Sequence, residues 1–154
     1  MSGNPQRKRN GVWPPAMPTE IEEHCETIED CYEFTLSYAA KGLATDEGSD
    51  LGKQLREKLT AAVKTMRGLE ASCALALVEL KLTPGQTYDA FFAVLARDAQ
   101  SSVAAIELVL AQPVISSQLI DNLNASIHLR ALLTDLFLIT DVVASRQAKA
   151  EASQ

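Results

Sequence analysis

Two histidines and three cysteines are the side chains of this sequence best suited to bind a metal or to act as nucleophiles. His24 and Cys31 lie seven positions apart, which places them on one face of a helix. With Cys73 and His128 from neighbouring helices they could form a zinc or copper site. Nothing in the spacing fixes those helices in register. The simpler interpretation is therefore a partly exposed histidine and buried thiols, with no metal site and no cofactor.

Sequence motifs of established enzyme classes are absent. A di-iron bundle needs Glu-x-x-His turns, but Ile21 and Ala125 stand three residues before the two histidines. There is no CxxC or CxxCH, and no GxSxG, Walker or GxGxxG motif. The His128-Leu129-Arg130 triplet invites comparison with phosphorelay bundles, yet its surroundings are spaced differently from a histidine-kinase dimerisation helix. The sequence assigns no catalytic residue and favours a protein that is not an enzyme, without deciding the matter.

Composition limits the classes of partner. Hydrophobic residues make up 47% of the chain and aromatic residues 5%, which favours helices over sheets. The formal net charge of -6 disfavours nucleic acid and favours partners with basic or apolar surfaces. No run of about 18 apolar residues exists, so we expect no membrane span. Met1 to Pro18 lacks the apolar region of a secretory signal, which predicts a cytoplasmic protein.

A first helix is predicted from Thr19 to about Lys41-Gly42. Thr19-Glu20-Ile21-Glu22 has the pattern of a capping box, in which the cap hydroxyl and the third side chain satisfy free backbone amides. Apolar and small residues then recur with alternating spacings of three and four, typical of one buried helical stripe. This stripe comprises Ile21, Cys25, Ile28, Tyr32, Thr35 and Ala39.

The second predicted helix begins after a polar loop, with Ser49 or Asp50 as its cap. Its regular apolar pattern extends over about 30 residues and indicates a bundle seam. The seam comprises Leu51, Leu55, Leu59, Ala62, Met66, Leu69, Cys73, Ala76 and Leu80. The segment from Ala71 to Val78 is almost entirely apolar, so we expect it to be covered on more than one side.

The third predicted helix is capped by Thr83, with Pro84 at its first position and Gln86 completing the box. It should end before Pro113, because proline cannot continue a helix. Its expected buried stripe comprises Tyr88, Phe92, Leu95, Ala99, Val103, Ile106 and Leu110.

A fourth helix should follow a cap at Ser116 or Ser117. Four such helices joined by short links predict an all-α fold, an up-down-up-down four-helix bundle with a disordered N-terminal arm. The expected organisation is a flexible arm at 1–17, the helical bundle at 18–146 and a flexible tail at 147–154.

The fourth helix carries more apolar residues than one bundle face needs, which predicts burial against a second copy or another protein. Leu129, Leu136 and Val143 recur every seven residues and are the predicted partner-binding stripe. They lie off the seam assigned to the core, which comprises Leu119, Leu123, Leu133 and Phe137. The alternative is a central helix wrapped by the other three.

Charge divides the first two helices. The first bears seven acidic residues before any Lys or Arg, whereas the second bears five basic residues from Lys53 to Arg67. The simpler interpretation is that their solvated rims attract one another weakly. The alternative is that the acidic face docks a basic partner.

The N-terminal arm combines a basic cluster, Arg7, Lys8 and Arg9, with the only tryptophan, Trp13, and a proline pair. Such a combination is typical of docking peptides, so these residues are also predicted to bind a partner. The alternative is that Trp13 folds back over the end of the bundle.

These patterns predict a non-enzymatic interaction protein, acting as a homodimeric adaptor, chaperone or assembly factor through its helical surfaces and an N-terminal docking arm. The alternative is a ligand- or metal-binding helical bundle with a redox or catalytic role. A bundle by itself does not decide between them.

Overall fold

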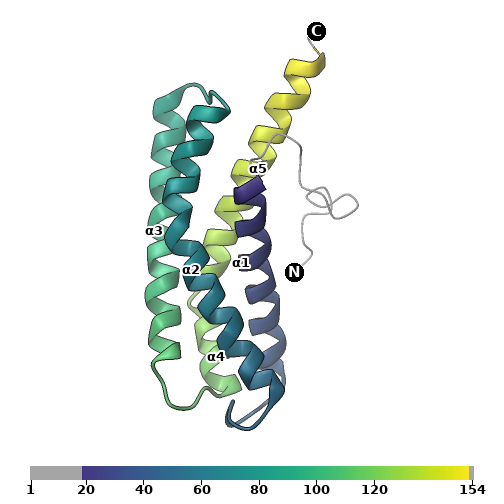
Figure 1. The fold of residues 1–154 in the computed structure, drawn as a ribbon, viewed down its shortest axis with the longest axis vertical. Coiled ribbons are helices and arrows are strands. Elements are labelled where there is room, and N and C mark those ends of the chain that lie inside the picture. Colours follow the sequence, from purple (N-terminus) through teal and green to yellow (C-terminus); the bar gives the residue numbers. More distant parts are fainter. Residues whose placement is uncertain (1–18, 153–154) are drawn as a thin grey trace.

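The computed structural model describes residues 19–152, which form five α-helices joined by short connections (Figure 1). The prediction of an all-helical fold is confirmed for this part of the chain, but five helices stand where four were predicted. Their bounds are α1 Thr19–Ala40, α2 Asp50–Glu79, α3 Gly85–Leu110, α4 Ser117–Ala125 and α5 His128–Ala152.

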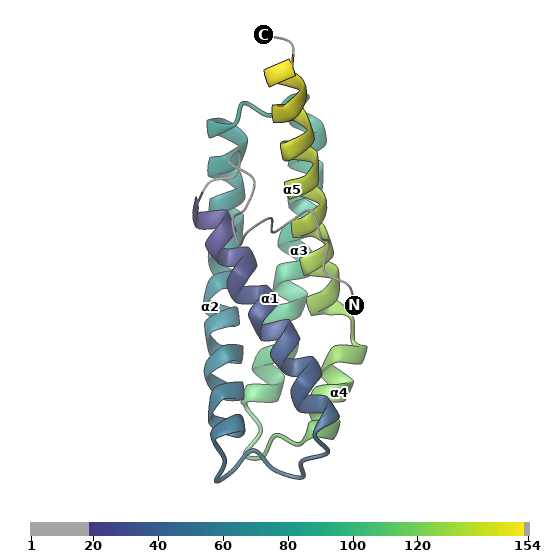
Figure 2. The ribbon, with the colours of Figure 1, turned by 90° about the vertical axis from the view of Figure 1, so that its right-hand side faces the viewer.

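The helices pack around a common core. In sequence order, α1 packs against α2 and α2 against α3, and both α1 and α3 contact α4 and α5. Among the described helices, the backbone of α2 comes close only to those of α1 and α3, so α5 lies diagonally across the bundle from it. Figures 1 and 2 show α4 and α5 following one another along the molecule, where a single fourth helix was predicted.

Local capping explains where most helices begin and end. Ser49 caps α2 by accepting a hydrogen bond from the Gly52 amide at 3.1 Å, as predicted. Ser116 caps α4 in the same way. Gly42, with φ of 65°, follows the end of α1, which agrees with the predicted end. The cap predicted at Thr83 is wrong, because Pro84 occupies the cap position and makes no side-chain bond.

The break between α4 and α5 was not predicted. Polar side chains there bond to backbone carbonyls instead of continuing the helix: Ser126 Oγ donates to Leu123 O at 2.6 Å, and Asn124 Nδ2 donates to Thr35 O at 3.2 Å. Ile127 then adopts φ of 62°, a left-handed conformation that ends a helix. The apolar face of α5 therefore starts from a new phase that does not continue the face of α4.

This change of phase corrects the predicted partner-binding stripe on the last helix. Leu129, Leu136 and Val143 are 4%, 0% and 2% exposed, so they belong to the core of a single chain and form no surface. The prediction that they lie off the core seam is wrong, because the seam was carried through Ile127 as if the helix were continuous. Of the residues assigned to the core seam, Leu123 and Leu133 are buried, while Leu119 and Phe137 are only partly buried.

One end of the bundle is held by buried polar groups. Asp46, 6% exposed, accepts a hydrogen bond from Arg56 Nε at 2.5 Å and from the Ile115 amide at 2.6 Å. Arg56 also donates to the carbonyls of Leu110 and Gln112, and Ser117 exchanges hydrogen bonds with Leu43. We call this set the polar hub. It joins the α1–α2 connection to the α3–α4 connection.

The opposite end is more open. The described residues do not cover the second half of α2 on several sides as predicted, since Leu75 is 47% and Val78 is 73% exposed. Arg146 of α5 fastens the α2–α3 connection by donating to Thr83 O at 2.7 Å and to the Tyr88 hydroxyl at 3.1 Å. Helix α5 continues to Ala152, past residue 146, where the sequence predicted a flexible tail.

Candidate functional site

His24 lies between α1 and α2, where its environment is structural. Its Nε2 lies 3.1 Å from Ser72 Oγ and 3.5 Å from Glu20 Oε1, and Ser72 Oγ lies 2.9 Å from the same carboxylate oxygen. In a serine-nucleophile triad the acid binds the second ring nitrogen and orients the base, whereas here both partners meet at Nε2. Ser72 is also 4% exposed, so a substrate cannot reach its hydroxyl. The cluster fastens the first turns of α1 to α2.

The possible metal ligands of the sequence analysis do not converge. Cys25, Cys31 and Cys73 are buried, whereas His128 is exposed at the start of α5. Burial raises the pKa of both Cys31 and Cys73 to about 12, with smaller contributions from nearby acids, so these thiols stay protonated and are poor ligands and nucleophiles. Within residues 19–152 no group of three His, Cys, Asp or Glu side chains is placed to hold a metal ion.

Two acidic side chains meet between α3 and α5. Burial, followed by the hydrogen bond and the charge of Asp98, raises the pKa of Asp135 to about 7. Asp135 Oδ2 is buried and has no hydrogen-bond partner among the described residues. This pair therefore holds a proton near neutral pH, and it can make the contact between these helices depend on pH.

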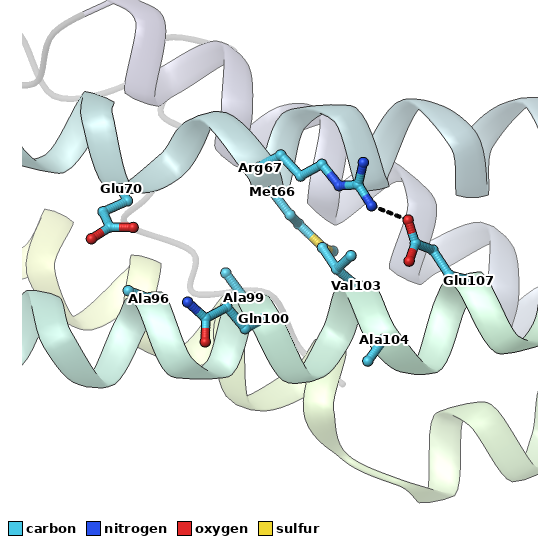
Figure 3. Close-up of a pocket in the computed structure, with 9 residues that line it drawn as sticks. All are labelled: Met66, Arg67, Glu70, Ala96, Ala99, Gln100, Val103, Ala104 and Glu107. Carbon is cyan, nitrogen blue, oxygen red and sulfur yellow. Dashed lines mark hydrogen bonds and ion pairs between the residues drawn. The ribbon is translucent and has the colours of Figure 1, made fainter.

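A surface groove with a volume of about 300 Å³ lies between α2 and α3. Figure 3 shows Met66 reaching from α2 toward Val103, while Ala96, Ala99 and Ala104 follow along α3. Alanine side chains on successive turns leave space that larger residues would fill. The α2–α3 groove is therefore apolar along its floor.

Charged and polar residues border this groove. Arg67 of α2 and Glu107 of α3 form an ion pair across one end, and Glu70 and Gln100 lie toward the other (Figure 3). Five of the nine lining residues are exposed, so the groove is an open surface and not an enclosed cavity: Arg67, Glu70, Gln100, Ala104 and Glu107. An open apolar floor with a polar border is suited to contact with another protein surface.

Of the residues predicted to bind a partner, the three on α5 do not line the α2–α3 groove. Leu129, Leu136 and Val143 are inside the core, and Trp13, Arg7, Lys8 and Arg9 lie outside the described residues. The groove was not predicted, because α3 was expected to have a single buried stripe. Its only trace among the lining residues of α3 is the series of alanines at positions 96, 99 and 104, which fits close packing against another helix equally well.

Two further results bear on what the chain can do. Among residues 19–152 no helix has the length and hydropathy needed to cross a membrane. In comparisons with known proteins, no protein-family model matches the chain, and neither does any curated protein or solved structure.

Proposed function

We propose that this protein is a non-enzymatic interaction protein, an adaptor, chaperone or assembly factor, whose α2–α3 groove receives an amphipathic helix of a partner. The observation that carries the proposal is the open, apolar floor of this groove between charged borders. Grooves of this kind bind the apolar face of a helix through residues spaced three or four apart.

The dimensions of the groove suit a short helix. Its lining on α3 extends from Ala96 to Glu107, which at 1.5 Å per residue is about 16 Å, or three helical turns. Met66 lies at the centre of the floor, and methionine adapts its shape to different apolar side chains. A partner helix would therefore place two or three leucine-sized residues along the alanines of α3.

The charge beside the groove determines which residues should flank the apolar face of the partner helix. Glu70 and Glu107 flank the groove, and the whole chain carries 20 acidic against 14 basic residues. Arg67 is already paired with Glu107, so the remaining border charge is negative. We therefore expect the partner helix to carry Lys or Arg beside its apolar residues, where opposite charge increases the association rate and specificity.

A labelled model peptide tests the proposal directly. The peptide would form an amphipathic helix of three to four turns with a leucine face and lysine borders, and fluorescence anisotropy would measure its binding to the full-length protein. We expect saturable binding that is lost in Ala104→Trp, because the indole fills the groove. A second peptide with glutamate in place of lysine should bind several-fold more weakly.

Ser101→Trp is the matched control, because Ser101 is exposed on α3 and does not line the groove. Circular dichroism should show both variants folded. Equal binding by the two tryptophan variants would contradict the assignment of the groove. Equal binding of the lysine and glutamate peptides would contradict the proposed charge of the partner.

A further inference from the structure

At the open end of the bundle, α1 begins part of the way along its neighbours (Figure 2). Glu20 and His24 both contact Ser72, so the first turn of α1 is level with Ser72 of α2. The last two turns of α2, from Cys73 to Glu79, extend beyond it. Helices α2 and α5 do not pack on one another, and α1 lies against both lower in the bundle. Above Thr19, none of the described helices fills the corner between α2 and α5.

This corner is apolar. A small cavity beneath it is lined by residues of α1, α2, α3, α5 and the α2–α3 connection, namely Ile21, Cys73, Ala76, Leu80, Leu82, Phe92, Leu136, Ile139 and Val143. Leu80 and Phe92 are only partly buried among the described residues, and Leu75, one turn beyond Ser72 on α2, is 47% exposed. Large apolar side chains left half-covered at a helix junction indicate that another apolar group lies over them.

We propose that residues 12–17, which include Trp13 and precede α1, pack over this corner. They would cover the part of it that α1 does not reach. The segment reads Val12-Trp13-Pro14-Pro15-Ala16-Met17 and contains no charged residue. The occupant is thus part of the same chain, joined to the corner at Thr19. This proposal is independent of the function proposed for the α2–α3 groove.

The length of the connection fits this position. Trp13 precedes Thr19 by six residues, which span at most about 20 Å when extended. The corner rises from Ser72 to Leu80, eight helical residues or about 12 Å. Pro14, Pro15 and Pro18 each restrict their own φ, so less conformational entropy is lost if the segment packs along the corner.

Charge supports the same placement. The first 18 residues carry three basic residues, Arg7, Lys8 and Arg9, and no acidic residue. Three glutamates near the corner, Glu23, Glu26 and Glu79, are exposed, and no Lys or Arg of the described residues pairs with them, although Lys81 and Arg146 also lie at this end. Burial, then the charges of Glu26 and Glu23, raise the pKa of Glu22. A basic segment held nearby would offset this repulsion.

Trp13 is the only tryptophan, so its fluorescence reports the position of the segment in the unmodified full-length protein. We expect emission at a shorter wavelength than that of a solvated indole, and quenching by acrylamide several-fold slower than for a free peptide of residues 1–18. Leu75→Glu places a charge at the corner and should shift the emission to longer wavelength and restore fast quenching. Glu79→Lys should act in the same direction but less strongly.

Leu108→Glu is the matched control, because Leu108 is 67% exposed on α3, which begins at the open end and carries Leu108 near its other terminus. This variant should keep the wild-type emission, and circular dichroism should show all three variants folded. Emission typical of solvated indole in the wild-type protein would overturn the proposal. So would protection of Trp13 that rises with protein concentration, because the occupant would then be a second copy.

Discussion

At the scale of single residues, two aspartates have opposite effects on stability as the pH changes. Asp135 has a pKa raised to about 7, above its ordinary value of 3.8. The unfolded chain therefore ionises this group at lower pH than the folded protein does. Its contribution to stability is present in full below about pH 4 and is lost as the pH rises toward 7.

We expect Asp135→Asn to remove this loss. At pH 8 the variant should be more stable than wild type by about 1 to 2 kcal/mol, a figure reduced to allow for solvent around the carboxyl pair. At pH 4 the two proteins should have nearly equal free energies of unfolding. Urea titrations at both pH values measure the difference. Asp121→Asn is the control, because Asp121 is exposed on α4. An equal effect at the two pH values would show that the proton is not involved.

Asp46 behaves in the opposite way. Burial alone would raise its pKa, but the hydrogen bonds from Arg56 and the Ile115 amide, with the charge of Arg56, outweigh burial and lower it. Its stabilising contribution is therefore present at neutral pH and is lost in acid, as the pH falls through the lowered pKa.

Asp46→Ala should destabilise the protein by about 2 to 4 kcal/mol at pH 7, because it leaves Arg56 Nε and the buried Ile115 amide without their acceptor. Thermal or urea unfolding measures this loss. Glu47→Ala, at the exposed neighbouring position, should change stability by less than about 0.5 kcal/mol. Similar losses in both variants would mean that the polar hub is not held by Asp46.

At the scale of elements, α5 is held in the bundle by the apolar residues that it contributes to the core. Leu136 is fully buried, whereas Leu138 on the same helix is 53% exposed. Leu136→Ala should cost about 2 to 5 kcal/mol because it leaves a cavity, and Leu138→Ala should cost less than about 0.5 kcal/mol. Unfolding titrations of the two variants compare them. Equally small losses of stability in the two variants would mean that Leu136 is not a core residue.

The sequence was sufficient for elements whose signals are local. The Ser49 cap and the seam of α2 from Leu55 to Ala76 were predicted correctly, because capping and helical periodicity depend on neighbouring residues. The α4–α5 break was not, because Asn124 bonds to Thr35 O, 89 residues away. The lack of cover by α1 over Leu75 and Val78 was not predicted, because their hydrophobicity does not reveal that α1 begins only level with Ser72.

The α2–α3 groove could not be predicted for a related reason. Alanines at 96, 99 and 104 read equally well as close packing against another helix. Only the position of α2, fixed by Met66 and by the Arg67–Glu107 pair, leaves the space in front of them open. The sequence thus contains the small residues, but not the distance between the helices that turns them into a groove.

At the scale of the whole molecule, the two ends of the bundle differ in how they are held. The polar hub joins two connections at one end, whereas the other end depends on Arg146 and on partly exposed apolar residues. Local stability falls where few buried contacts hold the backbone.

Hydrogen exchange should therefore be uneven along single helices. Amides in the last two turns of α2 and the first turn of α3 should exchange faster than those in the first half of α2. The difference is expected even though α2 is one continuous helix. Mass spectrometry of peptides covering residues 50–65 and 74–90 makes this comparison. Uniform protection of the two regions would mean that the bundle opens only as a unit.

The rate at which the three buried cysteines react would report how often the bundle opens locally. Cys25, Cys31 and Cys73 lie on α1 and α2, and none is more than 3% exposed. An oxidant or alkylating reagent can reach them only when these two helices separate, because in the closed protein burial raises the pKa of Cys31 and Cys73 to about 12 and keeps both thiols protonated. How long the reduced protein survives in an oxidising environment is therefore set by how often α1 leaves α2, and not by the intrinsic reactivity of its thiols.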